Sequence, residues 1–342
     1  MLGETPLVAH PVPSLRDLPI LAALGLAACL PFGAASTQDT DRGDTATDTS
    51  ATDTGWLDTA DVGDTGLYAR TADEVCARWQ AGHAITDEAP LDASGADCDP
   101  GTLSAAGIDD ALARIDLFRW LAGLGPTTDD DALDADAQAC ANLEAWWPFD
   151  GGSPHDPPAS SKCYTSEGAT TAAQSNIAWG PSGPAAALDQ FMVDAGNETT
   201  MGHRRWLMNP PLGPVGIGFW QTGGQYGTAA CVRIFGTSGG GPHPAWTAMP
   251  NPGVVPVQVA RWTWTLQGDL GGLADAGISV RRVGDGALLP VRVQRLDEGY
   301  AQPAVAWTPS GWTPEPGSTY RVTASGVTGG PLVYEVRPVT CP

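Results

Sequence analysis

The chain is poor in positive charge. Its 342 residues include 17 Lys and Arg against 39 Asp and Glu, which gives a formal net charge of −22. A protein that binds nucleic acid needs a basic surface to neutralise phosphates, so we expect no nucleic-acid partner. The sequence also lacks a C-x-x-C pair, which disfavours a zinc cluster built on that motif.

The apolar run near the N-terminus is short. Residues Leu18 to Leu30, LPILAALGLAACL, are too few to cross a bilayer as a permanent helix, but they have the form of a signal-peptide core. The tetrapeptide LAAC that ends at Cys29 resembles a bacterial lipobox, in which the cysteine is lipidated and becomes the first mature residue. We predict a signal peptide over residues 1–28 and lipidation of Cys29. The alternative is an ordinary cleaved signal with a chance cysteine.

An acidic, low-complexity segment follows. Asp-Thr recurs six times between Thr37 and Gly66, and such a segment cannot bury enough apolar area to offset its conformational entropy. We predict that residues 29–66 form a disordered tether. The chain would then be an exported, membrane-anchored lipoprotein at the cell surface or in the periplasm, with the outer membrane favoured. Calcium binding by the repeats is disfavoured because they lack the glycine-spaced ligands of calcium loops.

Six cysteines remain once Cys29 is set aside. An even number of scattered cysteines in an exported chain favours three disulfides. Fifteen connectivities are open, and proximity along the sequence favours the pairs Cys76–Cys98, Cys140–Cys163 and Cys231–Cys341.

The apolar pattern changes along the chain from helical to strand-like. Three- and four-residue spacing predicts helices from about Ser104, 131–147 and 184–195, and strands follow at 215–219 and 229–235. From about Trp246 onward, short alternating runs separated by turns are typical of a β-sandwich. We therefore predict the α+β class. The expected parts are a segment 67–103 closed by a disulfide, an α-β domain 104–240 and a β-sandwich-like domain 245–342.

Several short segments occur together in a characteristic order. They are PHDPP (154–158), SNIAWG (175–180), GHRRWLMNP (202–210) and VGIGF (215–219). Over about residues 104–235 this order resembles the CAP domain of cysteine-rich secretory proteins, antigen 5 and pathogenesis-related 1 proteins. The resemblance implies an α-β-α sandwich with a surface cleft. That cleft carries two histidines and two acidic residues and binds a divalent metal in some members.

The resemblance assigns the cleft residues by position. His155 and His203 match the two histidines, and Asp194 matches one acid, whereas Ser175 stands where the family has a glutamate. Two neutral imidazoles suit Zn²⁺ or another divalent cation, but a serine hydroxyl is a poor replacement for the missing acid. Further candidate cleft residues are Glu167, which could replace that acid, Asn176 and Arg204. For Asn176 a structural role is favoured. Of Arg204 and Arg205, one is expected to pair with Asp194 or Glu198 and the other to be solvated.

Three functions remain open at this point. The favoured one is a non-enzymatic, exported CAP-like lipoprotein that binds a small apolar ligand, a glycan or a protein partner through the cleft of His155 and His203. The second is a metal-assisted hydrolase of peptides or cell-wall material that uses the same histidines. The third is an adhesion or structural protein that uses the β-sandwich. Exposed tryptophans would support it, and the candidates are Trp246, Trp262, Trp264, Trp307 and Trp312.

Overall fold

The computed structural model describes residues 67–147, 152–222, 227–236, 239 and 243–342. These residues all belong to one compact unit, including those of the expected 104–240 and 245–342 domains. The predicted signal peptide, the lipidation site Cys29 and the acidic tether lie outside the described residues. Within the described part of the chain, no helix has the length and apolarity to cross a membrane.

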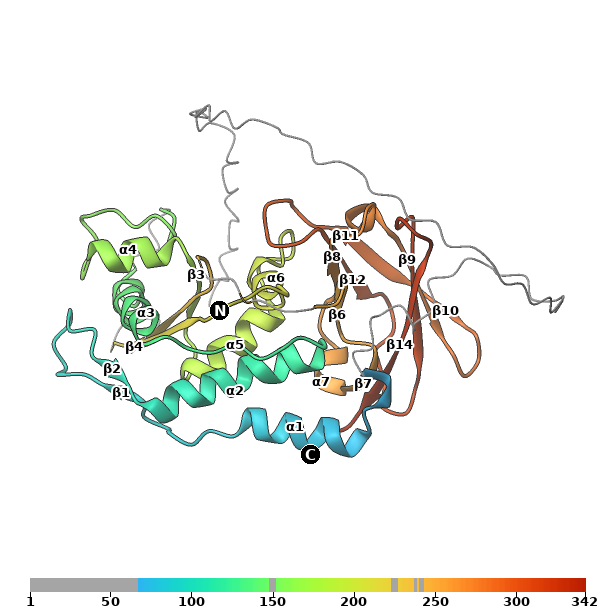
Figure 1. The fold of residues 1–342 in the computed structure, drawn as a ribbon, viewed down its shortest axis with the longest axis horizontal. Helices are drawn as coiled ribbons and strands as arrows, with labels where there is room; N and C mark the ends of the chain where they lie inside the picture. The colour runs from blue at the N-terminus through green and yellow to red at the C-terminus, as the bar shows by residue number, and fades with distance from the viewer. Residues whose placement is uncertain (1–66, 148–151, 223–226, 237–238, 240–242) are drawn as a thin grey trace, which may run out of the picture. The chain divides into compact units, whose positions relative to one another are not determined.

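The first part of the unit is a small sheet with helices (Figure 1). Its three antiparallel strands lie in the order β3-β5-β4, and a two-stranded pair, β1 with β2, precedes them. The strands are β1 Leu91–Asp92, β2 Thr102–Leu103, β3 Ser175–Trp179, β4 Gly216–Gln221 and β5 Thr228–Arg233. The helices are η2 Leu67–Ala69, α1 Ala72–His83, α2 Ala105–Leu121, α3 Asp131–Glu144, α4 Ser166–Ala172, α5 Pro184–Val193 and α6 Gly202–Leu207.

Helices cover both faces of this sheet. On one face, the β4 glycine Gly218 lies so close to the α3 backbone at Ala137 that any Cβ at this position would collide with it. On the other face, Phe219 belongs to the same apolar cluster as Phe118 of α2 and Leu188 of α5. The alternation of a strand places successive residues on opposite faces, so β4 needs glycine toward α3 and large apolar side chains toward α2 and α5.

The second part consists of two β-sheets. A five-stranded sheet has the order β10-β9-β13-β14-β7, and a four-stranded sheet has the order β11-β12-β8-β6. Trp264, Trp307 and Tyr334, which come from both sheets, are almost completely buried. The strands are β6 Trp246–Met249, β7 Gly253–Pro256, β8 Trp264–Gly268, β9 Gly277–Arg282, β10 Leu288–Leu289, β11 Val291–Arg295, β12 Ala304–Pro309, β13 Tyr320–Ser325 and β14 Leu332–Val339. Two short helices, α7 Val257–Ala260 and η3 Leu273–Asp275, complete the part.

The structure confirms the predicted α+β class, and the β-rich C-terminal part fits a β-sandwich. Ser104 caps α2 by accepting a hydrogen bond from the Gly107 N–H, as expected for a helix that begins there. The GHRRWL segment forms the helix α6.

Two buried arginines of α6 join the two parts of the unit. Arg204 is fully buried, and its guanidinium donates to the backbone oxygens of Met192, Val193 and Thr263. Arg205 is almost as buried and donates to the backbone oxygens of Thr200, Asp297 and Gln302. Burial lowers the pKa of each guanidinium to about 10, so both stay charged at neutral pH.

The expectation that one of these arginines pairs with Asp194 or Glu198 and that the other is solvated is therefore wrong. The acceptors of both guanidinium groups are carbonyl oxygens and the Thr265 hydroxyl, several of them from the β-sandwich part. A planar fork of five donors can satisfy several carbonyls at once. The basic cluster of the GHRR motif serves to hold α6 against its neighbours.

The three disulfides join Cys76 to Cys341, Cys98 to Cys163 and Cys140 to Cys231. The number of bridges was predicted correctly, but all three predicted pairs, Cys76–Cys98, Cys140–Cys163 and Cys231–Cys341, are wrong. Tertiary packing decides the pairing instead of sequence distance, because the entropy of closing a loop rises only slowly with its length.

Two of the observed pairs follow from the packing of the elements. Helix α3 lies over the sheet, which puts Cys140 above Cys231 of β5. Helix α1 contacts β7 of the C-terminal sheet, which brings Cys76 to the chain's end at Cys341. The segment 67–103 is therefore not closed on itself by a disulfide.

We expect that Arg204→Ala lowers the free energy of unfolding by about 3 kcal/mol or more, because several buried carbonyls lose a charged donor. Arg204→Lys should recover only part of this loss, since an ammonium cannot reproduce the fork. The exposed Arg292→Ala is the matched control and should change stability by no more than about 0.5 kcal/mol. Denaturant unfolding measures all three. An Arg204→Ala protein as stable as the control would refute the role given to Arg204.

Candidate functional site

His203 lies in the first turn of α6, and Asp194 fixes the orientation of its ring. Asp194 ends α5 in a left-handed conformation with φ 56°, and its carboxylate is completely buried. The Oδ1 atom of Asp194 lies 2.8 Å from Nδ1 of His203 and accepts from the Asn197 amide at 3.0 Å. The Oδ2 atom accepts from the Arg204 backbone N–H. The Asn197 amide nitrogen also lies 2.9 Å from Nδ1 of His203. Because the buried Asp194 carboxylate can only accept a hydrogen bond, we infer that Nδ1 of His203 carries the proton and that the neutral ring offers the Nε2 lone pair.

The neutral ring of His155 has the same tautomer, with its proton on Nδ1. It lies in the loop between α3 and α4, and its Nδ1 is 2.8 Å from the backbone oxygen of Ala172, the last residue of α4. A carbonyl can only accept, so Nδ1 of His155 carries the proton and Nε2 is again the free acceptor. The residue as a whole is exposed, but this hydrogen bond is partly buried. Loss of solvation lowers the pKa of His155, and the positive charge of His203 lowers it further.

The structure brings His203 and Asp194 of the predicted cleft into contact. The two imidazoles lie near enough for the charge of one to act on the other. Each ring is held through Nδ1 by a protein oxygen, an arrangement that favours the Nδ1-protonated tautomer and leaves Nε2 as the acceptor.

The remaining predicted residues take other places. The Ser175 side chain is buried in β3, and its hydroxyl has no hydrogen-bond partner. Asn176, on the opposite face of β3, donates to the backbone oxygen of His203, so its role is to support α6. Glu167 is exposed in the first turn of α4, and interactions within that turn lower its pKa. Nothing in its contacts brings Glu167 to the histidines, and Arg204 is too deeply buried to line a cleft.

Glu144 is a residue that sequence reasoning did not select. It is completely buried at the end of α3, and both carboxyl oxygens lack a hydrogen-bond partner. Burial raises its pKa to about 8. A signal was present in the sequence, because Glu144 continues the apolar stripe of Ala137, Cys140 and Ala141 on α3. A carboxyl group in such a stripe is expected to be either paired or protonated.

The donor set does not fit a resident zinc ion. A catalytic zinc site uses three protein ligands, and the two histidines supply only two Nε2 atoms. The Asp194 carboxylate is taken up by His203, Asn197 and Arg204. Within the ranges that the structure describes, the one group of three potential ligands is Asp129, Asp131 and Asp134 at the start of α3. That group contains neither histidine.

The tryptophans named for the adhesive function lie inside the β-sandwich part. Trp246, Trp264 and Trp307 are buried, and Trp262 and Trp312 are half-buried against the same core. No recognition surface of exposed tryptophans forms from these five residues.

Comparisons with models of protein families and with curated proteins find no match for this chain. The CAP resemblance therefore rests on the order of the sequence segments, and the site is interpreted from its own geometry.

We expect the pKa of His155 to rise in a His203→Gln variant, because the variant removes the nearby positive charge. Titration of the imidazole signals by NMR measures this shift. His243→Gln, which alters an exposed histidine of the loop before β6, is the control and should leave the pKa of His155 unchanged. An unchanged value in His203→Gln would mean that the rings are not neighbours.

Glu144 should make stability depend on pH. Its pKa is about 8 in the folded protein against 4.5 without the fold, so the folded state binds the proton more tightly. Its contribution to stability is complete below about pH 4.5 and is lost as the pH rises to about 8, by up to about 1.4 kcal/mol per pH unit. Unfolding curves of Glu144→Gln should lack this decline, whereas the exposed Glu167→Gln should keep it. The same decline in both variants would rule out Glu144 as its source.

Proposed function

We propose that this chain is an exported, CAP-like binding protein that takes a hydroxyl-rich ligand, a glycan, at His155 and His203. One observation carries the proposal: in both rings Nδ1 lies 2.8 Å from a protein oxygen, an arrangement that favours the proton on Nδ1 and leaves Nε2 as a hydrogen-bond acceptor. Two neighbouring acceptors of fixed direction suit the hydroxyl groups of a sugar, which are donors.

A glycan is favoured over the small apolar ligand considered above. Covering the two Nε2 lone pairs with an apolar group would leave them unsatisfied at a cost in free energy. Small apolar ligands also need an enclosing pocket. The cavities described in this structure, of about 90 and 120 Å³, are lined by other residues than His155 and His203. An open surface site suits an extended polymer better.

Export is supported by the three disulfides, which form and persist in oxidising compartments. We extend the proposal to a lipoprotein anchored through Cys29 and held away from the membrane by the Asp/Thr-rich segment. That arrangement would place the histidine pair where extracellular or cell-wall glycans are available. The hydrolase alternative lacks a third metal ligand among the described residues, and the adhesive alternative lacks exposed tryptophans.

We expect oligosaccharides of N-acetylglucosamine to bind the purified chain and to shift the imidazole signals of both histidines in NMR spectra. His155→Ala and His203→Ala should each weaken binding by about tenfold, the loss of one hydrogen bond. Asp194→Asn is the sharper variant. Its amide can donate to Nδ1, which would move the proton of His203 to Nε2 and turn the acceptor into a donor.

His243→Ala is the control and should bind as the unmodified chain does. Calorimetric titration with Zn²⁺ distinguishes the hydrolase alternative from glycan binding. Tight one-to-one zinc binding that disappears in both histidine variants would favour that alternative. Glycan binding that survives both histidine substitutions would refute the site proposed here.

A further inference from the structure

The three disulfides differ in their exposure to solvent. Cys140 and Cys231 are completely buried, and Cys341 is 5% exposed beside the half-buried Cys76. Cys98 is exposed, and its partner Cys163 is half-buried. A dissolved thiol must reach a sulfur atom to open a disulfide, so Cys98–Cys163 is the bridge that it can attack first.

This accessible bridge holds the loop that carries His155. Residues 152–164 are mostly exposed, and the hydrogen bonds of their backbone are internal to the loop. Three side chains bind the loop to other elements: the His155 ring contacts Ala172, the Lys162 ammonium pairs with Asp97, and Cys163 forms the disulfide. Of these three side-chain contacts, the disulfide is the covalent one.

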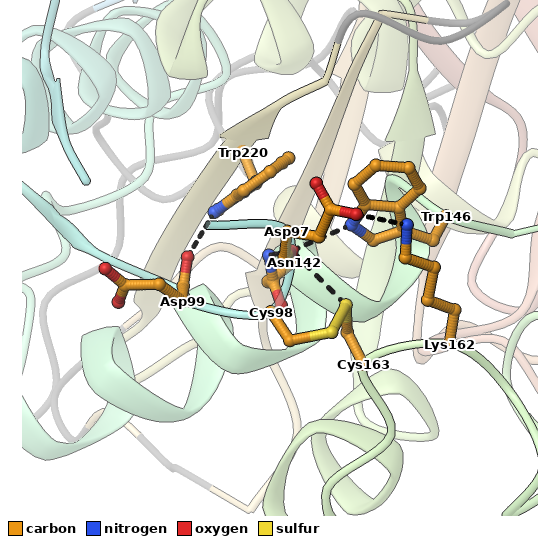
Figure 2. The surroundings of a disulfide bond; sticks show 8 residues. All are labelled: Asp97, Cys98, Asp99, Asn142, Trp146, Lys162, Cys163 and Trp220. Carbon is orange, nitrogen blue, oxygen red and sulfur yellow. Dashed lines mark hydrogen bonds and ion pairs between the residues drawn. A yellow bond between two sulfur atoms is a disulfide. The ribbon is translucent and has the colours of Figure 1, made fainter. Parts of the chain in front are cut away.

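The two sides of the bridge are held with unequal strength (Figure 2). On the Cys98 side, the backbone oxygen of Asp97 accepts from the side chains of Asn142 and Trp146, and the oxygen of Asp99 accepts from Trp220. Those three residues belong to, or follow directly after, α3 and β4. The Cys98 side should therefore stay in place when the bridge opens.

On the Cys163 side, Lys162 is the main remaining anchor. Its ammonium lies 3.2 Å from the centre of the Trp146 ring and 2.6 Å from the Asp97 carboxylate. Both charged side chains are about half exposed, at 45% and 60%, and an ion pair of this kind contributes little, about 0–1 kcal/mol. Without the disulfide, the loop and His155 would be free to leave the position that Ala172 defines.

We propose that Cys98–Cys163 is a thiol-exchange site through which small dissolved thiols release His155 and switch off the histidine pair. A thiolate attacks Sγ of Cys98, the Sγ–Sγ bond breaks, and Cys163 leaves as a thiolate that takes a proton from water. A second thiolate then attacks the sulfur that the first thiol contributed to the mixed disulfide, and Sγ of Cys98 leaves as a thiolate that takes a proton from water. Two thiols are oxidised to one small disulfide, and the protein disulfide is reduced to two cysteine thiols. The switching role rests on the proposed function, whereas the opening of the bridge does not.

The test treats the full chain with increasing dithiothreitol, blocks free thiols with an alkylating reagent and identifies the labelled cysteines by mass spectrometry. Cys98 and Cys163 should be labelled together before Cys76, Cys140, Cys231 or Cys341. Labelling of another pair first, or of all six together, would overturn the proposal.

The consequence for His155 is tested in a Cys98→Ser/Cys163→Ser double variant. Burial lowers the pKa of His155 in the folded loop, so release should raise it toward its ordinary value, as NMR titration would show. Lys162→Gln keeps the bridge and is the control, with the pKa of His155 unchanged. A double variant with the unmodified pKa would overturn the proposal. If labelling and titration come out as expected but no glycan binds, only the proposed function fails.

Discussion

The carboxylate of Asp194 is the group on which the site depends. It is excluded from water and receives three donors: the His203 ring, the Asn197 amide and the backbone N–H of Arg204 in α6. A buried carboxylate is stable only when such donors surround it. The same contacts end α5, begin α6 and select the tautomer of His203, so local fold and site chemistry have a common cause.

The β-sandwich part enters this arrangement through α6. Arg204 and Arg205 follow directly after His203, and their guanidinium groups bind backbone oxygens in loops of the C-terminal part. Gln267 of β8 donates in turn to the backbone oxygen of Met208 at the end of α6. The helix that presents His203 thus donates hydrogen bonds to the C-terminal part and also accepts one from it. The C-terminal part positions the site instead of presenting aromatic residues to solvent.

Much of the fold could be predicted from the sequence, because periodicity and capping are local. The helix that starts after Ser104, the glycine-rich strand β4 and the run of short strands after Trp246 all follow from such patterns. The disulfide pairs could not be predicted, since they depend on which elements pack together. The surroundings of Arg204 and Arg205 could not be predicted either, because they too depend on packing. A GHRR motif indicates a basic surface, and only the packing shows that carbonyl oxygens surround both side chains.

The candidate site could be predicted only in part, because the contacts that fix its side chains also depend on how the elements pack. Resemblance could point to His155 and His203, but the acceptors at Ala172 and Asp194, which fix the two rings, are products of the fold. The most direct test is the tautomer of each ring, measured by nitrogen NMR at a pH where both rings are neutral. The account predicts that both histidines carry the proton on Nδ1 and none on Nε2. A proton on Nε2 of either ring would contradict it.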